Sequence, residues 1–196
     1  MPSLDQAAID QLFGAARAQD KWTDAPVPDD TLHALFEILK YGPTSANCSP
    51  ARFLFLRTVD AKERLRPALS KANTDKTITA PVVVIVAQDP KFHDHLPRLF
   101  PQNPSAKSWF TSDYNLTETT MVRNATLQGA YLIMAARALG LDCGPMSGFN
   151  NATVDDVFLA DRGWKSNFLM ALGVGDPSVL KPRPPRFDFD DVCVLL

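Results

Sequence analysis

The run VVVIVAQ, residues 82–88, constrains the fold of this chain more than any other stretch. Its β-branched residues follow one another without a polar break, a pattern that favours an extended conformation. A strand without alternation of apolar and polar residues is typically covered on both faces. We therefore expect a central strand over residues 82–88, in a sheet with a layer of structure on each side.

Other strands and helices of unequal length surround this run. The aromatic-rich segment 52–58 and the apolar segment 167–175 predict two more strands. Apolar spacing predicts helices over residues 4–18 and 116–139, the second closed by Gly140. Because the strands do not alternate with helices at regular βαβ spacing, and neither G-x-G-x-x-G nor a P-loop is present, we predict an α+β layered domain.

Shorter elements are predicted from caps and turn residues. We expect Asp29 or Asp30, Asp60 and Thr153 each to cap a helix. The segment 142–150, rich in Gly, Pro and Asn, predicts a turn. The C-terminal RFDFD alternates like a tail that leaves the body and pairs at a sheet edge.

Composition narrows the classes of function. A chain of 196 residues with a hydrophobic share of 45% fits one domain, residues 1–196. Its net charge of −2 argues against a nucleic-acid partner or an anionic membrane surface. No apolar stretch approaches the roughly 20 residues that span a bilayer. Three cysteines without a C-x-x-C pair, and no export signal, indicate a soluble cytoplasmic protein.

Four local patterns have a plain interpretation beside a functional one. His93-Asp94-His95 is a solvated loop rather than a metal site, because i and i+2 histidines converge only on a strand. Cys48 has no neighbouring base and is a turn residue rather than a nucleophile. KPRPPR, residues 181–186, contains a P-x-x-P pattern that is common by chance. The proline-punctuated segment 90–111 is typical of lids or binding loops.

The segment YGPTSANCSP, residues 41–50, concentrates short polar side chains in one place. A helix-to-strand connector would account for them, since Gly, Pro, Asn and Ser are ordinary turn residues. The same residues also suit a polar ligand that must approach the backbone closely. Other segments supply cations, an amide and a glycine-rich turn, and together the pieces suit a phosphorylated aromatic cofactor.

The chain resembles the nitroreductase superfamily of FMN-dependent oxidoreductases, and within it the subgroup that contains the malonic semialdehyde reductase of pyrimidine utilisation. GPTSANCSP and GPMSGF are specific in combination, although neither suffices alone. The motifs run in order along almost the whole chain: GPTSANCSPAR at 42–52, ERLRPAL at 63–69, N-x-x-K at 73–76, APVVVIVA at 80–87, SWFTS at 108–112, GPMSGF at 144–149 and RPPR at 183–186.

The resemblance implies a three-layer sandwich, with a mostly antiparallel sheet flanked by helices. It also implies a homodimer that exchanges C-terminal tails and holds FMN at the subunit interface. NADH or NADPH would reduce the flavin, and a small acceptor would reoxidise it in a ping-pong reaction. The acceptor would be a nitroaromatic, a quinone or an aldehyde such as malonic semialdehyde.

Site residues also follow from the resemblance. The loop residues Pro43, Thr44, Ser45 and Asn47 would line the flavin from the opposite subunit. The resemblance places Asn73 and Lys76 near the pyrimidine edge of the ring. It places the turn Pro145, Met146, Ser147 and Gly148 at flavin N5 and O4, which the amides of Ser147 and Gly148 would face. The phosphate would be held by Arg17, Arg183 and Arg186.

One departure concerns the phosphate end. The family's N-terminal signature has two basic residues, a Ser and a further basic residue two positions later, whereas Ala16-Arg17-Ala18-Gln19-Asp20 keeps only one cation. We expect Asp20 to point outward, or this end of the site to be rearranged, because a carboxylate facing a phosphate would repel it.

The leading hypothesis is therefore an FMN-dependent NAD(P)H oxidoreductase. A flavin-binding protein without reductase turnover, serving as a sensor, a carrier or a consumer of the flavin, is the alternative. A third hypothesis, an interaction module that uses KPRPPR as its ligand segment, predicts no chromophore at all.

Overall fold

A four-stranded antiparallel sheet forms the middle layer of the protein. The computed structural model describes residues 2–196. The strand order is β1-β2-β4-β3, and every neighbouring pair is antiparallel. The strands are β1 (Ala51–Leu56), β2 (Val82–Gln88), β3 (Asp142–Met146) and β4 (Lys165–Gly173).

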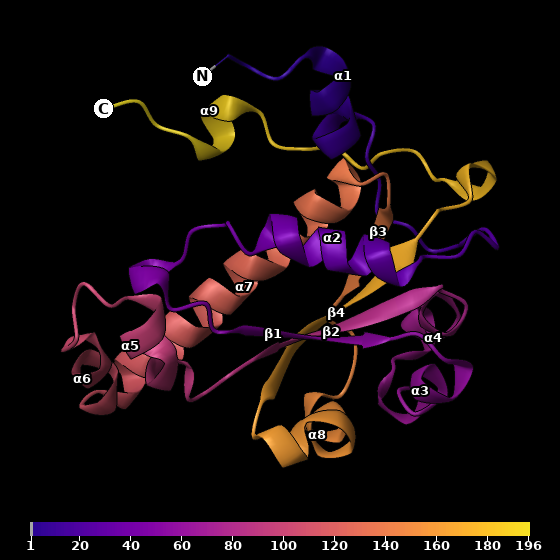
Figure 1. Ribbon diagram of the computed structural model, residues 1–196. Coiled ribbons are helices and arrows are strands. Elements are labelled where there is room, and N and C mark those ends of the chain that lie inside the picture. Colours follow the sequence, from indigo (N-terminus) through magenta and orange to yellow (C-terminus); the bar gives the residue numbers. More distant parts are fainter. Residues whose placement is uncertain (1) are drawn as a thin grey trace.

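The predicted central strand is confirmed. Strand β2 covers residues 82–88, is buried along its whole length and pairs with both β1 and β4. Strands β1 and β4 lie within one or two residues of the predicted segments 52–58 and 167–175. The α+β layered architecture is confirmed as well, with helices on both faces of the sheet (Figure 1).

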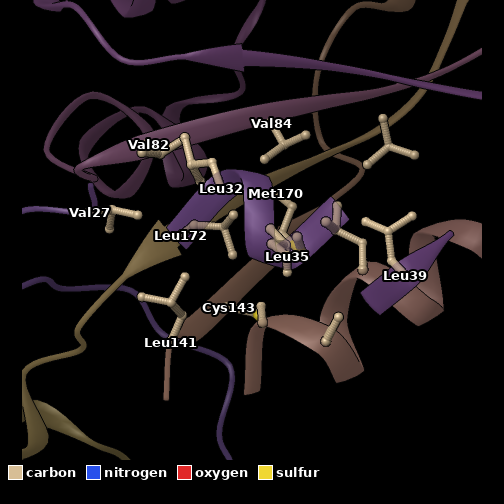
Figure 2. Packing of buried hydrophobic residues seen from close by; sticks show 14 residues of the cluster. Val27, Leu32, Leu35, Leu39, Val82, Val84, Leu141, Cys143, Met170 and Leu172 are labelled. Carbon is tan, nitrogen blue, oxygen red and sulfur yellow. The ribbon is translucent and has the colours of Figure 1, made fainter. Parts of the chain in front are cut away.

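One face of the sheet is covered by α2 (Asp29–Leu39) and the long α7 (Tyr114–Ala138). Their apolar side chains meet those of β2 and β4 in a cluster that includes Leu35, Val84 and Met170 (Figure 2). Helix α7 matches the predicted long helix, and Gly140 follows it with a positive φ of 77°. A left-handed glycine just beyond a helix is the usual C-terminal stop.

The other face is covered by shorter helices, α3 (Val59–Glu63), α4 (Lys71–Ile78) and α8 (Asn151–Val154) (Figure 1). A second cluster of buried residues, among them Leu65, Ile85 and Leu169, lies on this side. The sheet with its two helical layers is therefore the three-layer sandwich that was expected.

Segment 90–111 forms helices rather than an irregular loop. It contains a 3₁₀ turn (Phe92–His95), α5 (Leu96–Leu99) and α6 (Ala106–Thr111). Phe92 and Phe110 pack edge to face in a separate small core that also holds Cys48. The solvated loop expected at His93-Asp94-His95 is thus wrong, since this stretch lies in the 3₁₀ turn.

The predicted caps are wrong by one to three residues. Thr58, not Asp60, caps α3, because its side chain accepts from the amide of Ala61. Asn150 caps α8 by accepting from the amide of Thr153. Pro28 precedes α2, so both Asp29 and Asp30 lie inside the first turn, where carboxylates favour the positive end of the helix dipole.

Three other predictions need correction. The helix predicted over 4–18 is shorter, with α1 (Gln6–Ile9) continuing into a π-helical turn over Asp10–Gly14. The turn predicted over 142–150 begins as strand β3. RFDFD pairs with no strand of its own chain, and part of it enters the one-turn helix α9 (Phe189–Val192).

The C-terminal segment leaves the sheet, passes α1 and runs outward as an extended arm (Figure 1). We call residues 187–196 the C-terminal arm. Among residues 2–196, no helix combines the length and the apolar character needed to cross a membrane.

Candidate functional site

Arginines from the two ends of the chain line one pocket. Arg17, Arg183 and Arg186, the residues predicted to hold a phosphate, surround a cavity of about 440 Å³. Arg183 Nη2 donates to the carbonyl oxygens of Gly14 and Ala16, at 2.8 Å each, and Arg17 Nη2 donates to the carbonyl oxygen of Lys181. These reciprocal contacts bind the start of the C-terminal segment to the N-terminal segment. We refer to this cavity as the arginine pocket.

Arg186 is held differently from Arg183. Its Nη1 donates only to the carbonyl oxygens of Pro184 and Pro185, at 3.0 and 3.1 Å. A guanidinium carries five N–H donors, so most of those of Arg186 remain for a ligand. The prolines fix the backbone φ at three positions of this segment, which keeps the arginines at a defined spacing.

A fourth guanidinium, that of Arg137, also lines the arginine pocket. Arg137 lies in the last turn of α7, and its Nη1 donates to the carbonyl oxygen of Leu12 at 2.7 Å. The sequence reasoning missed it. A basic residue in a last helical turn is ordinarily explained by the helix dipole, so its sequence position gave no sign of this pocket.

Residues 17–20 form one wall of the site by lying along the edge of β3. Ala18 makes a parallel bridge with Cys143, and the amide of Gln19 donates to the carbonyl oxygen of Cys143 at 3.0 Å. A Cβ on Gly144 would stand 2.6 Å from the carbonyl oxygen of Gln19. Glycine is therefore needed at position 144 for the two segments to approach each other this closely.

The turn after β3 is supported from α4. Asn73 Nδ2 donates to the carbonyl oxygen of Gly148 at 3.0 Å, and the amide of Ser70 donates to the same oxygen at 3.1 Å. Asn73 and Gly148, both predicted cofactor contacts, are thus in contact with each other. Within the chain, the amide of Asn73 serves to position the turn.

The residues of this turn differ in exposure. Pro145, Ser147 and Gly148 are exposed, whereas Met146 is buried and accepts a hydrogen bond on its sulfur from the Thr77 hydroxyl at 3.1 Å. The side chain of Met146 is therefore part of the core, and only its backbone is available to a ligand. Pro145, Met146 and Ser147 also line a shallow hollow of about 350 Å³ against α7.

Lys76 lies between this turn and the arginine pocket. Its Nζ is 3.3 Å from Asp20 Oδ1, and its backbone carbonyl accepts from Trp22 Nε1 at 2.9 Å. Asp20 itself lines the arginine pocket, and its charge is balanced by the ammonium of Lys76. The expectation that its carboxylate points outward stays a prediction.

The loop 43–47 is firmly held, but elsewhere in the chain. The amide of Ser45 donates to Asn124 Oδ1 at 2.8 Å, and the Tyr131 hydroxyl donates to the carbonyl oxygen of Pro43 at 2.8 Å. Asn47 Nδ2 donates to the carbonyl oxygen of Leu99 at 2.7 Å, and the Thr44 hydroxyl accepts from the amide of Ser49 at 3.1 Å. Neighbouring elements therefore fix the loop on two sides.

The backbone of this loop is strained. Ala46, Asn47 and Ser49 have φ values of 49°, 51° and 38°, and they are the non-glycine residues with positive φ among residues 2–196. A left-handed backbone costs roughly 1–2 kcal/mol for Ala46 and Ser49 and less for Asn47, because Asn adopts this conformation readily. Such strain clusters at functional sites, which favours a role for the loop beyond that of a connector.

Helix α7 separates the loop from the turn after β3. Asn124 and Tyr131, which hold the loop, are on one face of α7, whereas Thr126, Ala130 and Ile133, which line the hollow beside Pro145, are on the opposite face at about 3.6 residues per turn. The single chain therefore brings the arginines, Asn73, Lys76 and the turn together, but leaves Pro43, Thr44, Ser45 and Asn47 on the far side of α7.

The environment of Cys48 does not suit a nucleophile. It is fully buried in the small core beside Phe92, and burial raises the pKa of its thiol to about 11. Burial likewise raises the pKa of Cys143 to about 12. Both thiols are protonated near neutral pH, so neither supplies the thiolate that nucleophilic catalysis needs. Within residues 2–196, no cluster of three or more metal-ligating side chains occurs.

Comparisons with known proteins agree on one family. The model of the nitroreductase family matches residues 15–175. Two relatives carry the name "Putative NADH dehydrogenase/NAD(P)H nitroreductase". The one from Burkholderia lata is 58% identical over 193 residues, 98% of each chain. The one from Cupriavidus pinatubonensis is 52% identical over 189 residues, 95% of this chain and 96% of the relative.

Solved structures share the fold. A crystal structure from Bacillus subtilis superimposes with a TM-score of 0.86 at 18% identity, covering 98% of this chain and 100% of the other. One from Exiguobacterium sibiricum gives a TM-score of 0.84 at 17% identity, covering 100% and 99%. Each is described as a "putative nitroreductase", the second in complex with FMN.

Proposed function

Since this chain belongs to the nitroreductase family, we propose that it is an FMN-dependent oxidoreductase that takes a hydride from NADH or NADPH and delivers it to a small acceptor. The observation that carries the proposal is the arginine pocket. Arg17 and Arg183 come from opposite ends of the chain, and each donates to backbone carbonyl oxygens in the segment that carries the other, beside one cavity. The wall of that cavity then continues along β3 to the turn that Asn73 supports.

The chemistry of the arginine pocket fits the phosphate of FMN. Guanidinium forks match phosphate oxygens in pairs, and four of them line the cavity.

The side chains have supporting roles. When bound, FMN supplies the hydride chemistry, as flavins do in other enzymes. Arg17, Arg183 and Arg186 anchor the phosphate, and the exposed amides of Ser147 and Gly148 direct hydrogen-bond donors toward the cofactor. Asn73 holds that turn in place through the carbonyl oxygen of Gly148. No side chain is required as a general acid or base.

A second copy of the chain completes the site. The loop 43–47 lies on the far side of α7 from the turn after β3, so a flavin bound at that turn meets the loop of a partner rather than its own. The pre-set, strained backbone of the loop suits close contact with a flat ring, because its short side chains leave room. We infer a homodimer with FMN at the interface.

The C-terminal arm supports exchange of tails within this dimer. Its apolar side chains, among them Phe187, Phe189 and Val194, are exposed in the single chain. Strand β1 has no strand partner on its outer side within residues 2–196, and Phe53 and Arg98 line a groove of about 650 Å³ beside it. Arg52 also lines this groove but is paired with Asp89 at 2.6 Å, so Arg98 is the arginine left to meet the acidic side chains of the arm. We propose that the arm of one subunit covers β1 of the other.

The acceptor and the cellular location are further parts of the proposal. The sequence motifs favour a small aldehyde such as malonic semialdehyde, with nitroaromatics and quinones as side substrates. The two buried cysteines and Cys193 are all free thiols, which fits a reducing compartment, so we place the enzyme in the cytoplasm.

The test is to purify the protein and record its visible spectrum and its NAD(P)H oxidation with a panel of aldehydes, quinones and nitro compounds. We expect a yellow protein whose chromophore has the mass of FMN and which turns over with NADH or NADPH. A colourless protein that neither binds added FMN nor oxidises NADH would contradict the proposal. FMN binding without turnover on any acceptor would instead support a flavin carrier or sensor.

A further inference from the structure

Asp20 is an acidic residue that lines the arginine pocket, whose arginines are proposed to bind the phosphate. Of the residues lining the arginine pocket, within the described chain, Asp20 is the acidic one, and the others include four arginines. A carboxylate at such a place disfavours a bound phosphate, since like charges repel. Its effect on the pocket depends on whether its charge is balanced.

Lys76 provides that balance. The Lys76 side chain is only 16% exposed, whereas that of Asp20 is 63% exposed, and their charged atoms are 3.3 Å apart. Within residues 2–196, this is the ion pair that each of them makes. A largely buried ammonium needs a partner, and Asp20 is the one available. The backbone of Lys76 is fixed as well, because its carbonyl oxygen accepts from Trp22.

We propose that Lys76 acts on the cofactor through Asp20, as a positioning residue that neutralises the carboxylate at the rim of the arginine pocket. The inference rests on the proposed function, and it differs from a direct contact between Lys76 and the flavin ring. The contribution of Lys76 to FMN affinity is then conditional on Asp20. A direct contact would contribute equally whether or not Asp20 carries a charge.

A double-mutant cycle separates the two cases. In Lys76→Met, Asp20 loses its partner and repels the phosphate, so FMN affinity falls by about tenfold. In Asp20→Asn, the repulsion is removed, and affinity rises or stays within about threefold of wild type. In the double variant, the loss caused by Lys76→Met shrinks to about threefold or less, because no carboxylate remains to be neutralised.

FMN affinity is measured by quenching of flavin fluorescence on titration of the apoprotein, with thermal melting of each apoprotein as the check on folding. Riboflavin, which lacks the phosphate, is the matched ligand, and its affinity should change much less than that of FMN in Lys76→Met. Lys76→Arg keeps the charge and should retain FMN affinity within about threefold. Raising the salt concentration should reduce the difference between wild type and Lys76→Met.

Additive effects in the cycle would overturn the inference, as would an equal loss of riboflavin and FMN affinity in Lys76→Met. Both results would place Lys76 on the ring rather than on Asp20. The failure of the proposed function looks different, because a wild-type chain that binds neither flavin rejects the function and this inference together. A wild-type chain that binds FMN but gives an additive cycle rejects this inference alone.

Discussion

Arg183 and Arg186 line the same pocket, but their hydrogen bonds give them different roles. Arg183 donates hydrogen bonds to the carbonyl oxygens of Gly14 and Ala16, so it joins two segments of the chain. Arg186 bonds only to Pro184 and Pro185 beside it. We therefore expect the first arginine to support the pocket as well as the proposed ligand, and the second to serve the proposed ligand alone.

Replacing each arginine by alanine should separate these roles. We expect Arg186→Ala to weaken FMN binding by about ten- to a hundredfold, since a charge-assisted hydrogen bond contributes about 1.5–3 kcal/mol, and to leave the melting temperature of the apoprotein unchanged. Arg183→Ala should lower both quantities, because two contacts to the N-terminal segment are also lost. Flavin titration and thermal melting of the apoproteins measure the two effects. Turnover at saturating FMN should fall less than affinity in either variant.

The opposite pattern would reverse the assignment. If Arg186→Ala retained FMN like wild type while Arg183→Ala lost it without any change in melting temperature, Arg183 would be the main phosphate ligand.

At the scale of elements, β3 shows why some of the structure was predictable and some was not. Strand β2 was predicted to the residue, because a continuous apolar run has no other stable placement in a small domain. Strand β3 contains Gly144 and Pro145, which are turn residues in isolation. It is tolerated as an edge strand, with β4 as its strand partner, where a proline without an N–H does little harm.

The site was predictable in its residue types but not in its assembly. The distance between Arg17 and Arg183 in the sequence does not indicate that they line the same pocket. Only the resemblance to a family predicted that they lie near each other. Arg137 and the ion pair between Asp20 and Lys76 are tertiary contacts of residues that look like ordinary surface charges. The predictions of the helix caps were wrong for a local reason. Thr58 and Asn150 have neighbours that are equally good N-cap residues, so the sequence alone did not distinguish between them.

A substitution in β3 should act on the site through the neighbouring segment. In Gly144→Ala the added Cβ would be 2.6 Å from the carbonyl oxygen of Gln19, so residues 17–20 must move away from the strand. We expect FMN affinity to fall by more than tenfold and the free energy of unfolding by about 1–3 kcal/mol. Flavin titration and chemical denaturation measure these quantities.

Gly163→Ala is the matched control for this prediction. Gly163 has a positive φ of 65°, but a Cβ there would meet no atom within 4 Å. The substitution should therefore cost about 1 kcal/mol of stability through backbone strain and leave FMN affinity unchanged. Equal FMN affinity in Gly144→Ala and Gly163→Ala would show that the segment 17–20 is not a wall of the site.

For the whole molecule, the proposed site is divided into two parts within the single chain, and the proposed dimer would join them. The arginine pocket and the turn after β3 lie on one side of α7, and the loop 43–47 lies on the other. Two copies can complete both sites at once, because a two-fold arrangement gives each pocket the loop of the other chain. Binding of FMN and dimerisation should then be linked, since each stabilises the same assembled state.

Removing the C-terminal arm should test this linkage. Phe187 and Val194 are 78% and 79% exposed, so the arm contributes little to the core of its own chain, and a chain ending at Arg186 should still fold. Without the arm to cover β1 of the partner, we expect the dimer to dissociate at least about tenfold more readily and FMN to be lost on dilution. Sedimentation of apo and FMN-loaded protein over a concentration series measures both effects.

Substitutions within the arm can separate the contribution of its charges to dimer stability from that of its apolar side chains. Asp188→Asn with Asp190→Asn removes charge only, and Phe187→Ser with Phe189→Ser removes apolar contact only. Apolar burial dominates stable interfaces, so the phenylalanine pair should weaken the dimer more than the aspartate pair, whose effect should fade at high salt. A truncated chain that remains dimeric and holds FMN like the full-length protein would show that the arm does not join the subunits.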